Sequence, residues 1–206
     1  MIERSRAREQ TKHETREALV AAALAEFGRH GLDAPSLDAI CARAGFTRGA
    51  FYVHFRNRDE LVVAAMERVL GAFLDAIIGT GDEPQDLETT LTRFAGALFA
   101  MADPRFAQPR AEAIGAVPLH RLLEACHRSA VVRERFVGLV RDAIERLEKA
   151  AASGKGGGRV RADVDSGSLA TMLAALALGV FAAREVGLPM DLDLLRATVA
   201  RLLAPR

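Results

Sequence analysis

The sequence predicts an all-α fold, because helical periodicity is nearly continuous and helix start and stop signals divide it into segments. Apolar residues recur at three- and four-residue steps, and no stretch shows the convincing two-residue alternation of a strand. Half of the 206 residues are hydrophobic and 27% are charged, as in a globular protein with a sizeable core. The formal net charge is only +1, so any site for a polyanion must arise from local clustering of charge.

The first predicted helix runs from about Thr11 to Arg29. Apolar residues recur along one of its faces, and Gly31 follows as a C-terminal stop. A short linker then leads to the next predicted helix, so the first helix is an independent element of the fold.

Two short helices follow, joined by a tight turn. Ser36 is positioned to cap a helix from Leu37 to about Ala44, and Gly45 supplies the break after it. Thr47 is positioned to cap the next helix, which covers about residues 48–55. Two short helices joined by so tight a turn form the helix-turn-helix pattern, in which the second helix can lie in a DNA major groove.

The second of these helices has two different faces. Phe51 and Phe55 are four residues apart and share an apolar face, to which Phe46 in the turn can add. We expect this face to anchor the helix in the core. The residues from Arg43 to Arg58 include four arginines and one histidine but no acidic residue, which is a local basic patch. The available face carries Arg48, Gly49, Tyr52 and Val53.

The rest of the chain is predicted to be helical as well. Asn57 can cap a long helix from Arg58 to about Ile78, which the sequence GTGDEP ends. A glycine-rich loop follows the helix that ends near residue 152. The further predicted helices cover approximately residues 87–101, 119–127, 131–152, 166–186 and 192–203.

The stretch from Thr15 to Leu70, above all SLDAICARAGFTRGAFYVHFRNRDEL, resembles the DNA-binding domain of the TetR family of bacterial transcriptional regulators. The resemblance implies three N-terminal helices that bind DNA, followed by a helical domain that senses a ligand and dimerises, with about nine helices in total. We therefore expect a DNA-binding domain over residues 1–56 and a ligand-binding and dimerisation domain over residues 57–206. The matching positions are Gly45, Thr47, Gly49, Tyr52, His54 and Phe55.

The resemblance also implies which side chains meet DNA. It assigns phosphate contacts to Thr47, Tyr52, His54 and Arg58, and the surface facing base edges to Arg48, Gly49, Ala50 and Val53. Arg48 can reach a guanine bidentately, whereas Val53 offers only an apolar contact to a thymine methyl. Arg58 stands where most family members have a lysine, so we expect a phosphate contact of different geometry. Ser36, at a helix N-terminus, could hold a further phosphate.

Partner predictions follow from the C-terminal helices and from the resemblance. Small residues in the helix over about 166–186 permit close helix approach, and leucines form an apolar stripe over about 192–203. Burial within one subunit would explain either helix alone. The resemblance implies that both contribute to a homodimer interface, and a symmetric dimer suits a palindromic operator in double-stranded DNA.

A small-molecule inducer would bind between the middle helices, and its identity is unknown. The ligand is expected to be hydrophobic or aromatic, because the candidate residues are mostly apolar. For most of these residues, ordinary core packing is the alternative. The candidates are Phe73, Phe94, Phe99, Met101, Phe106, His120, Leu123, His127, Phe136, Met172 and Phe181.

The N-terminal segment leaves two interpretations open. It is either a solvated tail or a basic arm that touches the DNA backbone or minor groove only in the complex. It has no apolar stretch of the kind that a secretory signal needs. Its charged residues are Glu3, Arg4, Arg6, Arg8, Glu9 and Lys12.

A cytoplasmic protein without membrane association is expected. The longest uncharged apolar run, Leu169 to Ala183, has 15 residues, fewer than the roughly 18 to 20 that span a bilayer. Cys41 and Cys126 lie far apart in helical patterns, so we interpret both as reduced, buried thiols.

Catalytic, metal and cofactor sites are not expected. The sequence SGKGGGR lacks the preceding strand and the Ser or Thr that a phosphate-binding loop requires. His120 and His127 are seven residues apart, about 10 Å along a helix, which is too far for one metal ion. We therefore expect a transcriptional repressor that a ligand releases from its operator. A transcriptional activator, or a ligand-independent DNA-binding protein of the same fold, is the alternative.

Overall fold

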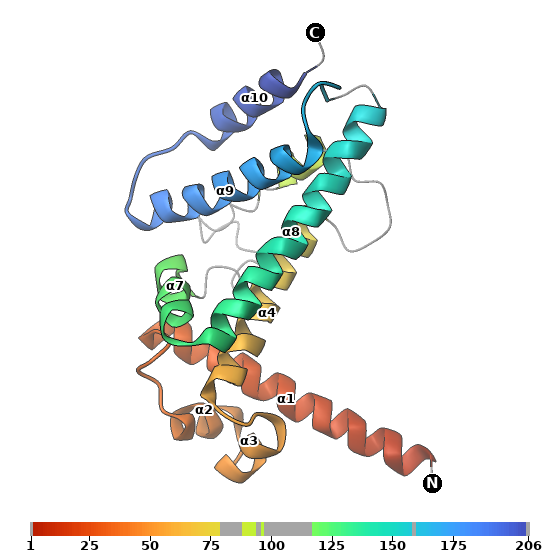
Figure 1. Ribbon diagram of the computed structural model, residues 1–206. Helices are drawn as coiled ribbons and strands as arrows, with labels where there is room; N and C mark the ends of the chain where they lie inside the picture. The colour runs from red at the N-terminus through yellow and green to blue at the C-terminus, as the bar shows by residue number, and fades with distance from the viewer. Residues whose placement is uncertain (1, 79–87, 94–95, 97–116, 158–159, 205–206) are drawn as a thin grey trace. The chain divides into compact units, whose positions relative to one another are not determined.

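The structure is a computed structural model that describes residues 2–78, 88–93, 96, 117–157 and 160–204. Within these ranges it contains α-helices and no strand, which confirms the predicted fold class (Figure 1). Contacts divide the chain into two compact units, and α4 and α8 contribute to both. The first unit comprises Met1–Val69 with Gly115–Phe136, and the second comprises Leu70–Ile114 with Val137–Arg206. The predicted functional boundary between residues 56 and 57 stays a prediction.

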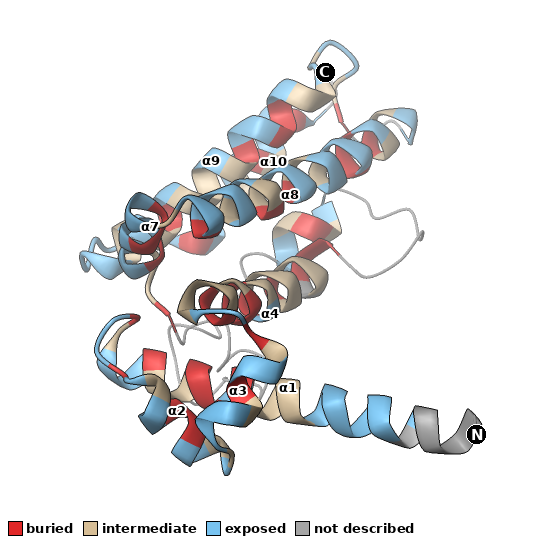
Figure 2. Cartoon of the chain, turned by 60° about the horizontal axis from the view of Figure 1, so that its bottom comes forward, coloured by how far each residue is buried: buried red, intermediate tan, exposed pale blue. Residues whose placement is uncertain are grey.

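The first unit begins with a helix that is longer than expected. Helix α1 spans Ile2–His30, so it starts well before the predicted position near Thr11. Its end is as predicted, because Gly31 adopts a left-handed conformation with φ of 79° and donates its N–H to the carbonyl of Phe27. The N-terminal turns of α1 extend past α2 and α3 and carry exposed residues (Figures 1 and 2). The N-terminal segment, for which the sequence leaves a tail and a basic arm as alternatives, is therefore helical.

Three further helices complete the N-terminal part of this unit: α2 (Leu37–Ala44), α3 (Arg48–His54) and the first half of α4 (Arg58–Ile78). Asn57 accepts a hydrogen bond from the N–H of Glu60 at 3.0 Å, which confirms the predicted cap of α4. Helix α1 packs against both α2 and α3. The core of the unit is formed by fully or almost fully buried side chains from each element, including Leu19, Phe27, Ile40, Phe51 and Leu61.

Helix α7 (Leu119–Arg128) and the start of α8 (Ala130–Gly156) also belong to the first unit. Arg128 pairs with Asp33 in the linker between α1 and α2 at 2.6 Å. The hydroxyl of Ser129 donates to a carboxylate oxygen of Asp59 in the first turn of α4 at 2.7 Å. The Ser129–Asp59 pair joins residues 70 positions apart, and the sequence pattern alone did not predict this association of α7 with the helix-turn-helix unit.

The second unit combines the end of α4, most of α8, α9 (Ser166–Glu185) and α10 (Leu192–Leu203). Helix α8 continues four residues beyond its predicted end near residue 152, into the glycine-rich stretch. Asp165 and Asp191 cap α9 and α10 through their carboxylates. One core cluster joins the end of α8 to α9 and α10 through Ala151, Val160, Leu169, Leu173, Val199 and Leu203.

Helix α9 is long and apolar enough to cross a membrane by length and composition alone. This is weak evidence, because an apolar helix that packs against protein passes the same test. Leu169, Ala170, Leu173 and Val180 are the buried residues of α9, whereas Met172 is half exposed. Packing within the second unit therefore accounts for one face of this helix.

Candidate nucleic-acid interface

The turn between α2 and α3 is built by local capping interactions. Gly45 has a φ of 77°, and its N–H bonds to the carbonyl of Ala42 while that of Phe46 bonds to the carbonyl of Cys41. This pair of bonds ends α2 in a Schellman motif, which favours glycine at the left-handed position. Thr47 then caps α3 by accepting a hydrogen bond from the N–H of Ala50 at 3.3 Å. The predicted helix-turn-helix boundaries are thereby confirmed.

One face of α3 anchors the helix in the first unit. Phe51 is fully buried and Phe55 almost so, with their ring centroids 5.5 Å apart. Phe46 in the turn is only partly buried, so its contribution to this anchor is smaller. Since the anchor fixes the rotation of α3 about its axis, it also determines which side chains of α3 face outward.

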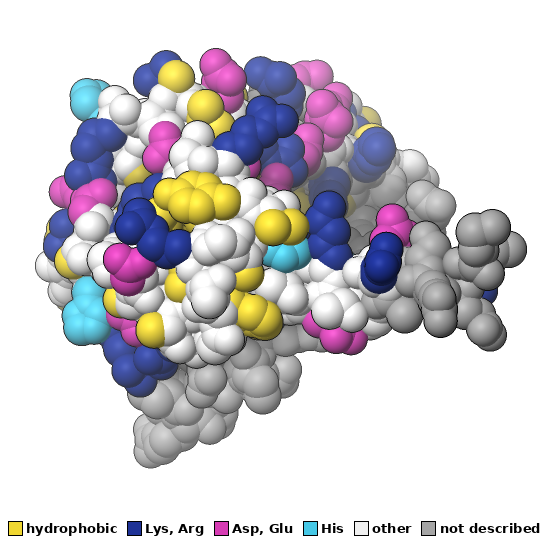
Figure 3. Space-filling model, turned by 90° about the horizontal axis from the view of Figure 1, so that it is seen from below, with side chains coloured by type: hydrophobic (Ala, Val, Ile, Leu, Met, Phe, Trp, Pro, Cys, Tyr) yellow, Lys and Arg dark blue, Asp and Glu magenta, His cyan; other side chains and the backbone are white. Residues whose placement is uncertain are grey.

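The opposite face of α3 presents an unusual surface for a soluble protein. The side chains of Tyr52 and Val53 are 53% and 66% exposed, although both are large and apolar. Arg48 and Gly49 are exposed beside them, and Ala50 is partly exposed. The face of the unit that carries α2 and α3 shows hydrophobic side chains among Lys and Arg side chains, with Asp and Glu side chains between them (Figure 3). An exposed helix face of this composition matches a protein surface that reads base edges and phosphates.

Two of the predicted phosphate ligands already serve as helix caps. Ser36 accepts a hydrogen bond from the N–H of Ala39 at 3.1 Å, just as Thr47 accepts one from Ala50. In both caps the hydroxyl acts as acceptor, so its proton remains available for donation to a phosphate oxygen. Both residues are exposed. Their geometry is compatible with the predicted contacts, which stay predictions.

Arg48 at the start of α3 is paired within the protein. Its Nε lies 3.4 Å from a carboxylate oxygen of Asp38 in the first turn of α2, and both side chains are more than half exposed. An ion pair in this setting contributes only about 0–1 kcal/mol, so it can be exchanged for a contact with a base. Pairing through Nε leaves the two terminal amino groups of Arg48 available to other acceptors. Sequence reasoning did not identify Asp38, because its role depends on the crossing of α2 and α3.

The other arginines of the predicted basic patch are also occupied. Arg43 donates to the carboxylate of Glu26 on α1 at 3.1 Å, and Arg56 lies 3.6 Å from the carboxylate of Glu60. Both acidic partners lie outside the stretch from Arg43 to Arg58 that contains no acidic residue. The basic patch seen in the sequence is therefore partly neutralised in the folded unit.

Arg58 is directed into the protein. Its guanidinium donates to the carbonyls of Leu32 and Pro35, the latter at 2.6 Å, and lies 5.5 Å from the ring centroid of Phe27. Burial lowers the pKa of Arg58, and the nearby carboxylates Asp33 and Asp59 act in the opposite direction. Arg58 thus ties α4 to the linker between α1 and α2. A phosphate contact would have to use the guanidinium N–H groups that these bonds leave free.

His54 lies at the end of α3 beside basic residues of α1. Burial lowers the pKa of His54, and the positive charges of Lys12 and Arg16 lower it further. The Arg16 guanidinium lies 5.2 Å from the ring centroid of Phe55, which fixes it against the end of α3. The sequence prediction placed His54 at the phosphate surface but did not include Lys12 or Arg16. Their spacing of four residues was a usable signal, because both lie within the helix that the sequence predicts from about Thr11.

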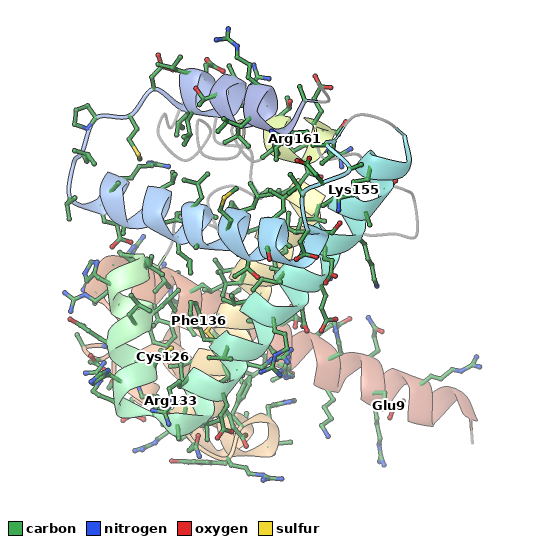
Figure 4. All side chains as sticks on the ribbon, turned by 45° about the horizontal axis from the view of Figure 1, so that its top comes forward. Glu9, Cys126, Arg133, Phe136, Lys155 and Arg161 are labelled. Atoms are coloured by element: carbon green, nitrogen blue, oxygen red, sulfur yellow. The ribbon has the colours of Figure 1, made fainter. Side chains whose placement is uncertain are left out.

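The predicted inducer-binding residues lie in different environments. Phe73 is buried and packs edge to face with the partly buried Phe181 at a centroid distance of 5.2 Å. Phe136 on α8 is partly buried (Figure 4), and Met172 on α9 is half exposed. His120, Leu123 and His127 are exposed on α7. The remaining candidates, Phe94, Phe99, Met101 and Phe106, lie outside the residues whose side chains the structure describes.

Thiols and potential metal ligands are the other chemically reactive groups of the described residues. Cys41 and Cys126 are both free and buried, as predicted, and burial raises the pKa of each thiol. Within the described ranges, no group of three or more His, Cys, Asp or Glu side chains could hold a metal ion. The exposed face of α3 is therefore the strongest candidate site in the described part of the chain.

Comparisons with known proteins agree with this geometry. The sequence profile for "Bacterial regulatory proteins, tetR family" matches residues 19–65, which include α2 and α3. The HTH-type transcriptional repressor SCO4008 of Streptomyces coelicolor is 32% identical over 79 residues, which cover 38% of this chain and 40% of that protein. The probable acrEF/envCD operon repressor of Escherichia coli is 43% identical over 47 residues, covering 23% of this chain and 21% of that protein. The matched region thus spans about two fifths or less of the length of these curated relatives.

Solved structures extend the likeness beyond the helix-turn-helix. The structure of a SmeT–triclosan complex is 30% identical with a TM-score of 0.66, over 90% of this chain and 89% of that chain. A structure of SmeT, described as the repressor of the Stenotrophomonas maltophilia multidrug efflux pump SmeDEF, is 29% identical with the same TM-score over 91% and 88%. Because the helix-turn-helix geometry, the profile match and this likeness along most of the chain agree, the protein belongs to the tetR family of bacterial regulatory proteins.

Proposed function

We propose that this protein is a sequence-specific transcriptional repressor whose helix α3 enters the DNA major groove. The exposed face of α3 carries this proposal: Tyr52 and Val53 are more than half exposed on a helix whose other face is anchored by the fully buried Phe51. The named roles of the relatives, which include a repressor in Streptomyces coelicolor, support it. A DNA-binding role also implies a cytoplasmic protein and gives no reason to expect catalysis.

The proposed contacts divide between base edges and backbone. Arg48 provides the bidentate contact to a guanine after it leaves Asp38, and Val53 meets a thymine methyl. Gly49 and Ala50 permit close approach of the helix to the bases. The hydroxyls of Ser36, Thr47 and Tyr52 donate to phosphates and fix the register of α3 in the groove.

A homodimer bound to a palindromic operator follows from exposed apolar residues in the second unit. Leu194 and Leu202 on α10 are 61% and 67% exposed, and their spacing of eight residues places them two turns apart on one side of the helix. Val186 and Leu188, which follow α9, are also exposed. A partner copy would cover these side chains. The α3 helix of that copy would then contact a second half-site about 34–36 Å away, which is one turn of DNA.

Release from the operator is proposed to occur when a hydrophobic or aromatic small molecule binds the second unit. The solved complex of SmeT with triclosan supports this class of ligand, and Phe73 and Phe181 form an aromatic contact in the second unit against which such a ligand could pack. The ligand shifts the population only if it binds the released conformation more tightly than the DNA-bound one. Triclosan is therefore a suitable first probe.

The proposal is tested by fluorescence anisotropy with duplexes that tile the DNA flanking the protein's own gene. We expect one palindromic segment to bind two chains far more tightly than arbitrary duplex. Tyr52→Phe removes only the hydroxyl, and should weaken binding to specific and arbitrary DNA alike by about 2- to 10-fold, the value of one hydrogen bond. Equal affinity for every duplex would contradict sequence-specific repression and indicate an architectural DNA-binding protein.

A further inference from the structure

The positive charge that the folded protein leaves without a close partner is not where the sequence concentrates its arginines. In the stretch from Arg43 to Arg58, every arginine is engaged by a carboxylate or by backbone carbonyls. By contrast, Arg8 and Lys12 on α1 are exposed and make no ion pair with any residue that the structure describes. Unpaired cations are the groups that gain most from an external anion, because no internal contact has to be broken first.

These residues form one face of α1. Arg8, Lys12 and Arg16 are separated by four residues each, so they lie in a row along one side of the helix. The row covers about 12 Å by the helical rise of 1.5 Å per residue, which is comparable with three to four base pairs measured along the DNA axis at roughly 3.4 Å each. We call Arg8, Lys12 and Arg16 the α1 basic row.

The α1 basic row ends at the recognition helix. The guanidinium of Arg16 lies over the ring of Phe55, the residue that ends α3. The charges of Lys12 and Arg16 reach the imidazole of His54. Arg16 has a contact of 3.8 Å with Glu17, whose carboxylate is shared with Arg68 at 3.1 Å, so its charge is weakly compensated. The last residue of the row therefore lies beside the end of α3, next to Phe55 and near His54.

We propose that the α1 basic row binds DNA backbone phosphates beside the major groove that α3 enters. This inference rests on the proposed DNA-binding function and adds a contact surface on α1 to it. A nucleic-acid backbone is the occupant that fits, because it presents regularly spaced negative charges to a row of cations that ends beside His54. The α1 row fixes position without reading sequence, because phosphate contacts carry no direct information about bases.

The test measures the salt dependence of DNA affinity for charge-neutral variants. Glutamine keeps the helix propensity of arginine and lysine, so Lys12→Gln removes charge with little effect on α1. Each lost phosphate contact lowers the slope of log K against log salt by about 0.9, so Arg8→Gln/Lys12→Gln should lower it by about 1.8. Between 50 and 200 mM salt this difference corresponds to about threefold in affinity per contact. The loss should be equal for operator and arbitrary duplex.

Two matched variants on the same helix distinguish a binding face from a change in net charge. Arg6 is two residues from Arg8 and six from Lys12, so it points about 160° and 120° away from these two substituted residues round the helix. Arg6→Gln removes the same charge and should leave the salt slope unchanged. Glu9 lies in the N-terminal part of α1 (Figure 4), three residues before Lys12, and Glu9→Gln should tighten binding because it removes a nearby repulsive charge.

Each outcome decides between the inference and its alternatives. If Arg8→Gln/Lys12→Gln keeps the wild-type slope while Tyr52→Phe weakens binding, the α1 row is a solvated surface and only this inference fails. An effect of Arg6→Gln equal to that of Arg8→Gln would overturn the inference in favour of long-range attraction by net charge. If wild-type protein shows no preference for any duplex, the proposed function fails first.

Discussion

Two basic regions of the first unit differ in how the fold uses their charge. The helix-turn-helix arginines are held by acceptors on α1, α2, α4 or the linker before α2, and Arg58 is bonded to two carbonyls. The α1 basic row projects from a helix whose N-terminal turns are exposed (Figure 2). The density of arginine in the sequence therefore overstates the charge available to DNA near α3 and understates it on α1. The difference teaches that pairing, and not composition, determines where a phosphate surface lies.

The largest expected effect tests whether Arg58 stabilises the fold by bonding α4 to the linker between α1 and α2. Arg58→Ala should lower the free energy of unfolding by about 2–4 kcal/mol, because it removes two charged hydrogen bonds to the carbonyls of Leu32 and Pro35. Arg58→Lys should lose part of this stability, since an ammonium group cannot span both carbonyls as a planar guanidinium does. Urea unfolding measures both. Unchanged stability with a reduced salt slope would instead favour a phosphate contact as the main role of Arg58.

The next effect tests whether Arg48 can leave its internal partner to read a base. Arg48→Ala should lower discrimination at one base pair of each half-site by about 1–3 kcal/mol. Asp38→Asn is the control, because it breaks the ion pair while it keeps Arg48. It should alter stability by less than about 1 kcal/mol, as expected for an exposed pair. Competition binding with single base-pair changes provides the measurement. Arg48→Ala with an unaltered base preference would remove Arg48 from the reading surface.

A smaller effect concerns Gly49, where one substitution should change stability and operator affinity in opposite directions. A Cβ on Gly49 would meet only the Thr47 hydroxyl at 3.6 Å, which is ordinary van der Waals contact. Gly49→Ala should therefore raise stability by up to about 1 kcal/mol through its better helix propensity. Operator affinity should fall, because the added methyl stands between α3 and the bases. Thermal unfolding and anisotropy measured on the same sample check both signs. A more stable variant with full affinity would exclude close approach at this position.

The smallest effect concerns pH and links the two regions. Burial and the charges of Lys12 and Arg16 lower the pKa of His54 below its usual value near 6.5, so the imidazole of the free protein is mostly neutral at pH 7. A phosphate favours the charged imidazole and raises this pKa in the complex. The complex therefore binds more protons than the free protein, and affinity should rise as the pH falls from about 8 to about 6.

His54→Gln should flatten this pH profile, and Lys12→Gln should raise the pKa of His54 in the free protein. Anisotropy across the pH range and NMR titration of the imidazole measure the two effects. If affinity fell on acidification, His54 would not contact a phosphate. If Lys12→Gln left the pKa of His54 unchanged, His54 would not interact with the α1 basic row.

Helix boundaries were largely predictable, because they depend on neighbouring residues. The bounds of α2, α4 and α10 agree with the predicted residues, and Ser36, Thr47 and Asn57 cap as expected. The early start of α1 and the extension of α8 past residue 152 were missed. In both cases residues with poor apolar patterning or with glycine continue a helix that had already formed, and adding a residue to a helix costs much less than nucleating one.

The sequence by itself determined the helix-turn-helix and the outward face of α3, since caps and four-residue spacing act over one or two turns. Only the tertiary structure decided which charges stay available. Arg43 finds Glu26 at a separation of 17 residues, and Arg58 reaches carbonyls 23 and 26 residues away. Such pairs depend on distances between helices, which no local pattern encodes. Because Coulomb attraction acts through space, the fold can neutralise a basic stretch of sequence and leave a mixed one free to bind.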